Sequence, residues 1–363
     1  MVASVPYDVL SQAEADAIKA LNPKSFLHVS LPATPSEGRA ALDKFRDEGI
    51  FVKEAEPMFY AYRQIMGSHS QTGIVATFDT EEYRSGVIKQ HEKTRKDKED
   101  DRTRHIEVMG MQTGPAFLTY RDDRAIDLIV EDACRNTTPI YDFTADDGIR
   151  HTVWKIGSKS ACACDELVEL FARVKTAYIA DGHHRSAAAT RFAAAHNNEG
   201  ESRYFMATIF PASQLKILAY NRLVKDLNGL TADEFLEKLG KSDGARSCRA
   251  YIAGKWHEFR WNIPEGADVV SALDAQYLQD HVLSPILGIG DPRTDKRISF
   301  VGGIRGDKAL EDAVDSGAAA VAFAMNPVTV DEMMAIADAG AIMPPKSTWF
   351  EPKLRSGLFL HEV

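Results

Sequence analysis

The sequence has 363 residues, of which 44% are hydrophobic and 26% are charged, values that exclude a largely disordered chain and allow a large core. The 43 basic and 53 acidic residues give a net charge of −10, which argues against a nucleic-acid-binding protein and favours small-molecule partners. We find no secretory leader pattern and no run of eighteen apolar residues, so we expect a cytoplasmic protein that does not bind membranes.

The four cysteines do not suggest a disulfide framework in a chain of this length. Cys162 and Cys164 are one residue apart, and neither this spacing nor that of Cys134 and Cys248 defines a zinc site. We expect ordinary thiols in a reducing compartment.

Residues 1–70 predict an α/β region. Ser11 with Glu14 three residues later is the pattern of a capping box at the start of a helix. Residues 25–30 (SFLHVS) alternate like a strand, residues 39–49 have helical spacing, and residues 57–66 read as a strand rich in aromatic residues.

Residues 71–219 predict a second region that begins with a strand at 71–78 and contains a highly charged stretch at 91–105. This stretch holds six basic and five acidic residues in fifteen positions. Such a mixture is typical of a solvated helix with ion pairs one turn apart, and it equally fits a mobile segment that brings Glu92 and several cations to a phosphate site. The spacing does not decide between these two readings.

Further elements follow in the same region. We expect a Gly-Pro turn that runs into a strand at 111–120, a strand at 204–210, helices at 125–134 and 165–173, and a hairpin at 141–155 whose turn is Asp147-Gly148. Residues 220–363 predict a third, C-terminal α/β region, with a hairpin at 250–263 and helices that begin after Thr231 and Thr329.

Near the C-terminus, Pro344-Pro345 fixes an extended path for Lys346, Ser347 and Thr348. A lysine on such a stiff segment could meet a phosphate or substrate as a point charge. The same spacing fits a lysine on the surface, so both readings stay open.

The most informative stretch is 176–197, TAYIADGHHRSAAATRFAAAHN. An apolar run ends at Ala180, a polar turn contains Asp181 and Gly182, and an alanine-rich segment follows, which predicts strand, tight turn and helix. Glycine allows close approach of the backbone to a ligand, and the first N–H groups of a helix attract anions. His183, His184 and Arg185 could then neutralise phosphoryl oxygens, although a helix cap with a surface ion pair is the simpler alternative.

Four segments together resemble the domain of unknown function 1015 family over nearly the whole chain. They are YIADGHHR, IKQHEKTRKDKEDDRTRH, GIGDPRTD and MPPKSTWFEPKLRSGLF. The turn itself is similar to the phosphate-binding motif of the ParB/sulfiredoxin-like superfamily, and in particular of its free serine kinases. This resemblance implies a mixed-sheet α/β (α+β) core at 71–219, flanked by the α/β regions 1–70 and 220–363.

The resemblance also implies an activity, transfer of a phosphoryl group from ATP or ADP to L-serine or a similar hydroxyl compound, with Mg²⁺. Residues implied to bind nucleotide phosphates are Gly182, His183, His184, Arg185, His91 and Arg95. Asp181 would hold Mg²⁺ directly or through water, Glu92 would act as general base, and Asp181 and His184 would join it in catalysis. Nucleotide and a small substrate are the expected partners, with a homodimer as an open alternative to a monomer.

Relatives with other chemistry fit less well. A sulfiredoxin needs a cysteine where this chain has His183, and a chromosome-partitioning ParB protein pairs its nucleotide site with a helix-turn-helix and basic surfaces. Besides a small-molecule kinase, two readings remain: a nucleotide-binding regulatory module without an acceptor, and a metal-dependent hydrolase that uses His91, His183 and His184. A buried His91-Glu92 pair beside the turn would favour the kinase, and a turn without an acceptor pocket would favour the module.

Overall fold

The computed structural model describes residues 2–157, 162–240 and 243–363. It divides into two compact units: one formed by Met1–Leu215 and Pro352–Val363, and one formed by Lys216–Glu351. The sequence predicted three regions, 1–70, 71–219 and 220–363, whereas the two units change at Leu215–Lys216 and at Glu351–Pro352. No division falls near residue 70, however, and the last twelve residues return to the first unit, which the sequence did not predict.

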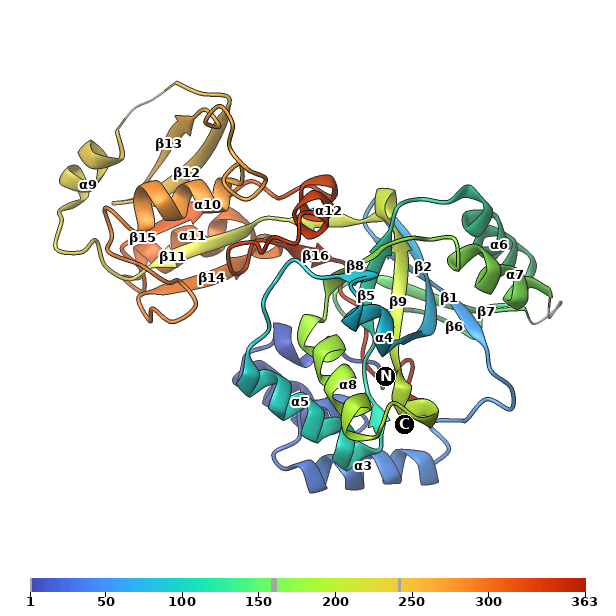
Figure 1. The fold of residues 1–363 in the computed structure, drawn as a ribbon. Helices are drawn as coiled ribbons and strands as arrows, with labels where there is room; N and C mark the ends of the chain where they lie inside the picture. Colours follow the sequence, from blue (N-terminus) through green and yellow to red (C-terminus); the bar gives the residue numbers. More distant parts are fainter. Residues whose placement is uncertain (1, 158–161, 241–242) are drawn as a thin grey trace. The chain divides into compact units, whose positions relative to one another are not determined.

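The first unit is built on a sheet whose described strands run in the order β3-β8-β5-β9-β2-β1-β7-β6 (Figure 1). These strands are β1 (Phe59–Met66), β2 (His69–Asp79), β3 (Ile88–Lys89), β5 (Ala116–Tyr120), β6 (Tyr141–Thr144), β7 (Arg150–Ile156), β8 (Ala177–Asp181) and β9 (Tyr204–Pro211). The β3–β8 and β5–β9 pairs are parallel and the other neighbours antiparallel. The expected mixed α+β sheet is confirmed.

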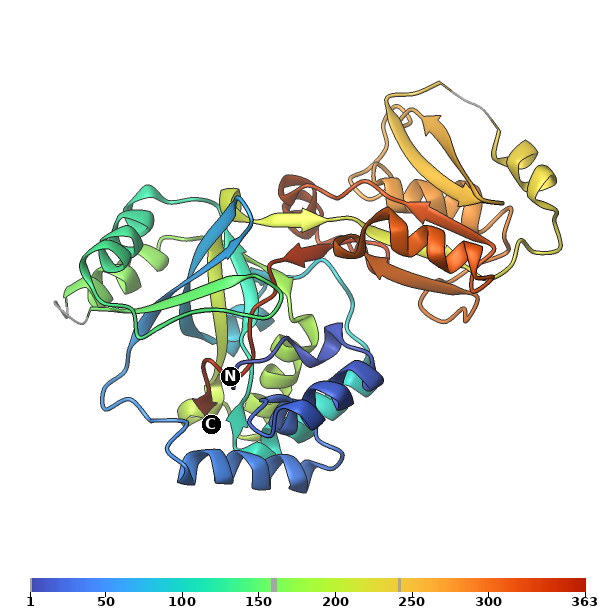
Figure 2. The same cartoon turned by 180° about the vertical axis from the view of Figure 1, so that it is seen from behind.

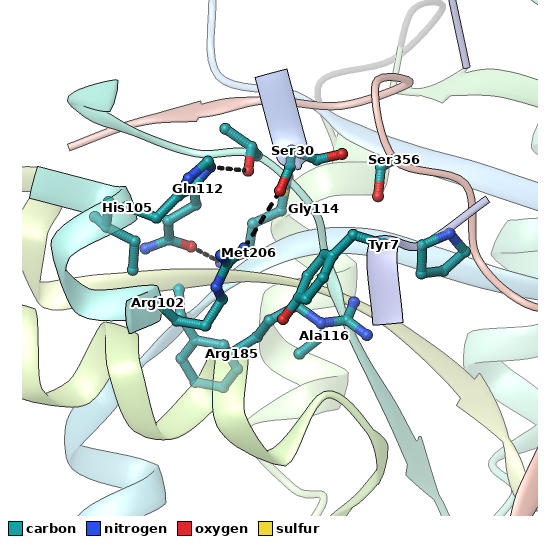
Figure 3. A pocket seen from close by; sticks show the side chains of 14 residues that line it. Tyr7, Ser30, Arg102, His105, Gln112, Gly114, Ala116, Arg185, Met206 and Ser356 are labelled. Carbon is teal, nitrogen blue, oxygen red and sulfur yellow. Dashed lines mark hydrogen bonds between the residues drawn. The ribbon is translucent and has the colours of Figure 1, made fainter. Parts of the chain in front are cut away.

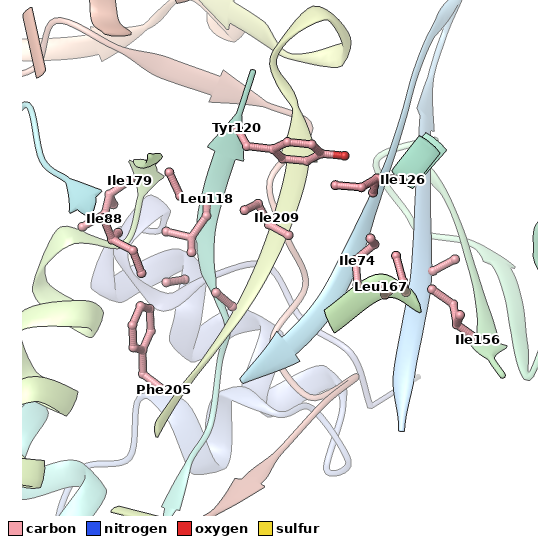
Figure 4. Packing of buried hydrophobic residues seen from close by; sticks show 14 of the residues in the cluster. Ile74, Ile88, Leu118, Tyr120, Ile126, Ile156, Leu167, Ile179, Phe205 and Ile209 are labelled. Carbon is pink, nitrogen blue, oxygen red and sulfur yellow. The ribbon is translucent and has the colours of Figure 1, made fainter. Parts of the chain in front are cut away.

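Helices of this unit pack on the sheet through their apolar sides. They include α4 (Thr80–Arg84), α6 (Arg124–Asn136), α7 (Cys162–Phe171) and α8 (His183–Ala195). Figure 4 shows Ile126 of α6 and Leu167 of α7 beside Ile74 and Ile209 of the strands. Helix α8 adds mainly alanine, whose small side chain lets a helix lie close to its neighbours while it favours helical backbone.

A smaller apolar cluster joins α2 (Leu27–Ser30), α3 (Pro35–Asp47) and α5 (Lys96–Met109). The N-terminal segment also forms η1 (Tyr7–Val9) and α1 (Gln12–Leu21). The capping box at Ser11 and Glu14 is confirmed, but the strand predicted at 25–30 is wrong. Those residues form one helical turn because Ser25 Oγ accepts a hydrogen bond from the N–H of Leu27, and Phe26, Leu27 and Val29 are all buried.

The second unit contains an antiparallel sheet in the order β13-β12-β15-β11-β14 and a ribbon of β10 and β16. Its strands are β10 (Lys216–Leu218), β11 (Tyr220–Val224), β12 (Arg246–Ile252), β13 (Lys255–Trp261), β14 (Ile298–Gly302), β15 (Val321–Ala324) and β16 (Trp349–Glu351). Its helices are α9 (Ala232–Leu239), α10 (Asp274–Leu278), η4 (Gln279–Leu283), η5 (Gly303–Arg305), α11 (Gly306–Asp315) and α12 (Val330–Asp338). The predicted hairpin and both capping boxes are confirmed.

The two ends of the chain meet in the first unit (Figures 1 and 2). Ser4 and Ser356 form an isolated antiparallel bridge, and β17 (His361–Glu362) pairs with β4 (Met111–Gln112). The remaining short helices of this unit are η2 (Gly200–Arg203) and η3 (Ala212–Gln214). Both pairings lie outside the sheet that carries the predicted turn, and they bring residues that are far apart in sequence together within the first unit.

Among the described helices, none offers an apolar stretch that would reach across a bilayer. Within the described residues, Cys134, Cys164 and Cys248 are unpaired thiols, as expected. The side chain of Cys162 lies outside the described part of the structure.

Candidate functional site

The predicted strand, turn and helix are confirmed around Gly182. Strand β8 ends at Asp181, Gly182 has φ of 90°, and α8 begins at His183 without a side-chain cap. This φ favours glycine, and a Cβ on Gly182 would lie 3.2 Å from the Cα of Ala116 and from the guanidinium of Arg185. The turn therefore needs glycine for both conformation and space, and it leaves the positive end of the α8 dipole at the edge of the sheet.

Strand β3 brings His91 and Glu92 to the same edge. The parallel pairs Ile88–Ala177 and Lys89–Tyr178 place the ends of β3 and β8 together, so the residues that follow each strand become neighbours. The rings of His91 and His183 lie 4.5 Å apart, edge to face, and the two side chains are 1% and 6% exposed. Glu92 is half-buried beside them, and its charge acts on His91.

Both histidines are neutral at ordinary pH. Burial, and the repulsion that would arise if His183 were protonated as well, lower the pKa of His91 to about 3, although Glu92 and Asp181 favour its protonation. Burial lowers the pKa of His183 to about 4, although Asp181 opposes the shift. The Nε2 atom of His183 is buried without a hydrogen-bond partner among the described residues. His183 is therefore a neutral hydrogen-bonding group rather than a cation.

This neutrality predicts a pH dependence of stability. Above pH ~6.5 neither the folded nor the unfolded chain protonates these rings, and below it the unfolded chain takes up protons that the folded one resists. The free energy of unfolding should then fall by about 1.4 kcal/mol per pH unit for each such histidine, down to its folded pKa. Urea unfolding at pH 7, 6 and 5 measures the slope. In the His183→Gln variant this slope should be smaller by the contribution of one histidine, about 1.4 kcal/mol per pH unit. An unchanged slope would contradict the assignment of His183 as a buried neutral group.

Asp181 is held by two cations. Its carboxylate oxygens lie 2.9 Å from Nζ of Lys353 and 3.7 Å from Nη2 of Arg185. Burial alone would raise the pKa of Asp181, but Lys353 and Arg185 outweigh it and hold the pKa well below the usual range. Asp181 is thus a permanent anion that gathers two cations at the start of α8.

His184 ties the turn to the charged stretch. Its Nε2 accepts a hydrogen bond of 3.1 Å from the backbone N–H of Arg95, so its ring proton is assigned to Nδ1. Arg95 is the N-cap of α5, is exposed, and forms an ion pair with Asp97. The sequence left two readings for residues 91–105, and in the structure an irregular segment that bends at His91 and Glu92 precedes helix α5, which begins at Lys96.

Lys353 was missed in the sequence. In the structure, Nζ of Lys353 donates a 2.9 Å hydrogen bond to the carboxylate of Asp181. The backbone carbonyl of Lys353 accepts a 2.8 Å hydrogen bond from the side chain of Gln64. The signal was present, because Pro352-Lys353 repeats the Pro345-Lys346 pattern seven positions later. Spacing alone does not select one lysine over the other.

Arg355 anchors the segment that carries Lys353. This arginine is 4% exposed; its Nε donates to Nε2 of His151 at 3.1 Å, and its Nη2 pairs with Asp147. The other ring nitrogen of His151 lies 2.7 Å from the hydroxyl of Tyr62. Because Nε2 of His151 accepts, the ring proton belongs to Nδ1, and burial with Arg355 nearby lowers the pKa of His151 to about 3. A buried polar chain thereby fixes the C-terminal segment.

The residues Lys346, Ser347 and Thr348 lie in the second unit. Lys346 is exposed, with Nζ 5.4 Å from the ring centre of Tyr220, and buried Ser347 donates to the carbonyl of Pro344 at 2.8 Å. Thr348 is half-buried. Their role as substrate contacts remains a prediction.

No group of three or more His, Cys, Asp or Glu side chains in the described ranges is placed to hold a metal ion. His91, His183 and His184 therefore do not form a preassembled metal site, and the hydrolase reading gains no support.

A pocket lies beside the turn, with a cavity volume of about 40 Å³ (Figure 3). It is lined by residues of the N-terminal segment, α5, the loop before β5, α8, β9 and the C-terminal segment. Arg185 belongs to both the pocket and the turn, and Ala116, which approaches Gly182, also lines the pocket. The turn therefore has as its neighbour a cavity with both polar and apolar lining residues.

Three solved structures show a distant likeness to this chain. A free serine kinase in complex with AMP is 13% identical, with a TM-score of 0.39 over 76% of this chain and 86% of that one. A conserved hypothetical protein from Pyrococcus furiosus is also 13% identical, with a TM-score of 0.39 over 78% and 93%. SbnI with C-terminal truncation from Staphylococcus aureus is 10% identical, with a TM-score of 0.43 over 78% and 85%.

Identities of 10–13% with TM-scores of 0.39–0.43 do not indicate what reaction this chain could carry out. No curated protein matches it. One family model does match, over residues 1–276, and its description is "Protein of unknown function (DUF1015)". The match covers the charged stretch and the turn but ends before Lys353. Over that length, the chain belongs to the DUF1015 family.

Proposed function

We propose that this chain is a nucleotide-dependent phosphotransferase, which moves a phosphoryl group from ATP or ADP to the hydroxyl of a small acceptor such as L-serine. The observation that carries the proposal is the buried Nε2 of His183 at the uncapped start of α8. Buried polar atoms nearly always have partners, so an atom of this kind at a positive helix end indicates a ligand with oxygen atoms. The likeness of the turn to the phosphate-binding motif of free serine kinases points in the same direction.

The cations around Asp181 support phosphate binding. Lys353 and Arg185 bring two positive charges to one carboxylate, which leaves an excess of positive charge beside the helix end. We assign Gly182 and His184 to the nucleotide phosphates through the first turn of α8, with His91 and Arg95 at the border of the site. Charge neutralisation is the main task of an enzyme that transfers phosphoryl groups.

Mg²⁺ enters this proposal as part of the nucleotide substrate. Each oxygen of Asp181 faces a cation, so this residue by itself does not fit the metal-ligand role predicted for it. Mg²⁺ in such sites keeps substrate phosphates and water among its ligands. We therefore assign Asp181 the task of positioning Lys353 and Arg185.

Glu92 is the proposed general base. It would take the proton of the acceptor hydroxyl while that oxygen attacks the terminal phosphorus of the nucleotide. The bond from phosphorus to the bridging oxygen breaks, ADP leaves from ATP or AMP from ADP, and the acceptor becomes a phosphomonoester. The partial burial of Glu92 beside His91, and the pocket beside the turn, favour this activity over a regulatory module without an acceptor.

Phosphorus-31 NMR tests the proposal. The purified chain is incubated with Mg²⁺, ATP or ADP, and amino acids that include L-serine, and the same mixture is followed with His184→Ala. We expect a new phosphomonoester signal with one acceptor, and its loss in the variant. Nucleotide binding without any new ester would reject the phosphotransferase and favour the regulatory module.

A further inference from the structure

The pocket beside the turn has an unusual balance of charge. Two arginines, Arg102 of α5 and Arg185 of α8, line it, and its lining contains no carboxylate (Figure 3). Arg102 lies over the ring of Tyr7 at 4.3 Å and donates to the carbonyl of Ser30 at 3.4 Å. Its partner Asp101 is exposed and outside the lining. Asp181, the partner of Arg185, also lies outside the lining, so the cavity itself presents two guanidinium groups and no carboxylate.

Ser30 supplies a second, independent observation that points to a ligand in this pocket. Its side chain is 2% exposed and lines the pocket, and its Oγ has no hydrogen-bond partner in the described part of the chain. A buried hydroxyl without a partner costs free energy in the folded protein. A ligand oxygen in the pocket would satisfy it.

The remaining polar lining is neutral and adds no competing charge. His105 is buried, its Nε2 lies 3.1 Å from the hydroxyl of Thr113, and burial lowers its pKa to about 4. Gln112 is occupied on both sides, since its amide donates to the carbonyl of Tyr204 and accepts from the N–H of Met206. The two arginines therefore set the charge preference of the cavity.

The size of the cavity limits what it can hold. A cavity needs about 10–15 Å³ for one water molecule, so about 40 Å³ accommodates roughly three waters. This is room for a planar group of three or four heavy atoms, and it is too little for a ribose or a base. A carboxylate has this size, and its two oxygens match the planar donors of a guanidinium.

We propose that this pocket binds the carboxylate of the phosphoryl acceptor, so that the acceptor is a small hydroxy acid or hydroxy amino acid. This inference rests on the proposed phosphotransfer at the neighbouring turn. Arg102 and Ser30 hold the carboxylate, and Arg185 joins the pocket to the nucleotide site. The acceptor's hydroxyl then extends toward Gly182, because Ala116 borders both the pocket and the turn.

The test measures binding alone, without turnover. Isothermal titration calorimetry of the full chain uses glycolate, which carries the carboxylate and hydroxyl of the class, and ethylene glycol, which lacks the carboxylate. We expect glycolate to bind and ethylene glycol to bind at least about tenfold more weakly, since hydrogen bonds between charged groups contribute about 1.5–3 kcal/mol, a factor of about 10–150.

Three variants locate the binding. Arg102→Gln should weaken glycolate about tenfold to a hundredfold, whereas Arg104→Gln, an exposed arginine of the same helix, should leave it unchanged. Ser30→Ala should weaken glycolate about two- to tenfold without a loss of thermal stability, because the wild-type hydroxyl has no partner to lose. Ser30→Ala keeps the test decisive if Arg102→Gln folds poorly.

Two outcomes would overturn the inference. In the first, glycolate fails to bind the wild type. In the second, Arg102→Gln and Ser30→Ala weaken the binding of inorganic phosphate or AMP and leave the binding of glycolate unchanged, which would make the pocket a phosphate subsite. The proposed function is tested separately. Glycolate binding without any phosphomonoester would reject the phosphotransferase alone, and phosphoryl transfer to an acceptor without a carboxylate would reject the inference alone.

Discussion

Replacing Glu92 with glutamine should slow phosphoryl transfer by about 10²–10⁴-fold, the usual contribution of a general base. Glutamine preserves the size of the side chain and removes only its ability to accept the hydroxyl proton. Because the nucleotide contacts are assigned to the start of α8, the affinity for nucleotide should change little. Initial rates at saturating nucleotide, together with calorimetric affinity, measure both effects.

Glu107→Gln is the matched control for this prediction. Glu107 is an exposed carboxylate of α5, and we expect the wild-type rate for this variant. Full activity of Glu92→Gln would remove Glu92 from the chemistry. Loss of nucleotide affinity in Glu92→Gln would instead make Glu92 a structural or binding residue.

Lys353→Met should destabilise the fold and weaken nucleotide binding together. Breaking a fully buried ion pair by removing one partner costs roughly 3–5 kcal/mol. Asp181 keeps 27% of its side chain exposed and has Arg185 at 3.7 Å, so we expect about 2 kcal/mol. The loss of a cation at the turn should also weaken the binding of ADP about tenfold or more. Urea unfolding and calorimetry measure the two effects.

Two further variants interpret this result. Adding Asp181→Asn to Lys353→Met removes the carboxylate whose remaining cation is Arg185 at 3.7 Å, and it should restore part of the lost stability, which a double-mutant cycle detects. Lys346→Met tests the lysine that the sequence first suggested. If Lys346→Met weakens the binding of ADP and Lys353→Met does not, Lys346 rather than Lys353 is the lysine that faces the phosphates.

The strand, turn and helix around Gly182 could be predicted because all of their signals are local. An apolar strand, a glycine and a helix-forming run follow one another within 22 residues. The same holds for the capping boxes at Ser11, Thr231 and Thr329, each set by two residues three positions apart. Residues 25–30 show the limit of such local signals, since six alternating residues were too few to distinguish a strand from one helical turn.

The partners of the turn could not be predicted, because pairing over long distances in the chain creates them. His91 meets His183 only because β3 and β8 run parallel, and no local pattern encodes that pairing. Lys353 reaches Asp181 because the C-terminal segment crosses back to the first unit, where Arg355 and His151 hold it. The charge of the site is therefore a property of the fold rather than of any single motif.

The most direct test of the central claim is to map the amides that respond to ADP. In ¹H–¹⁵N NMR spectra of the labelled chain titrated with Mg²⁺ and ADP, we expect the largest shifts at Gly182, His183 and His184, with smaller ones near Lys353. Shifts confined to other parts of the chain, with these amides unmoved, would contradict the assignment of the turn as a nucleotide phosphate site.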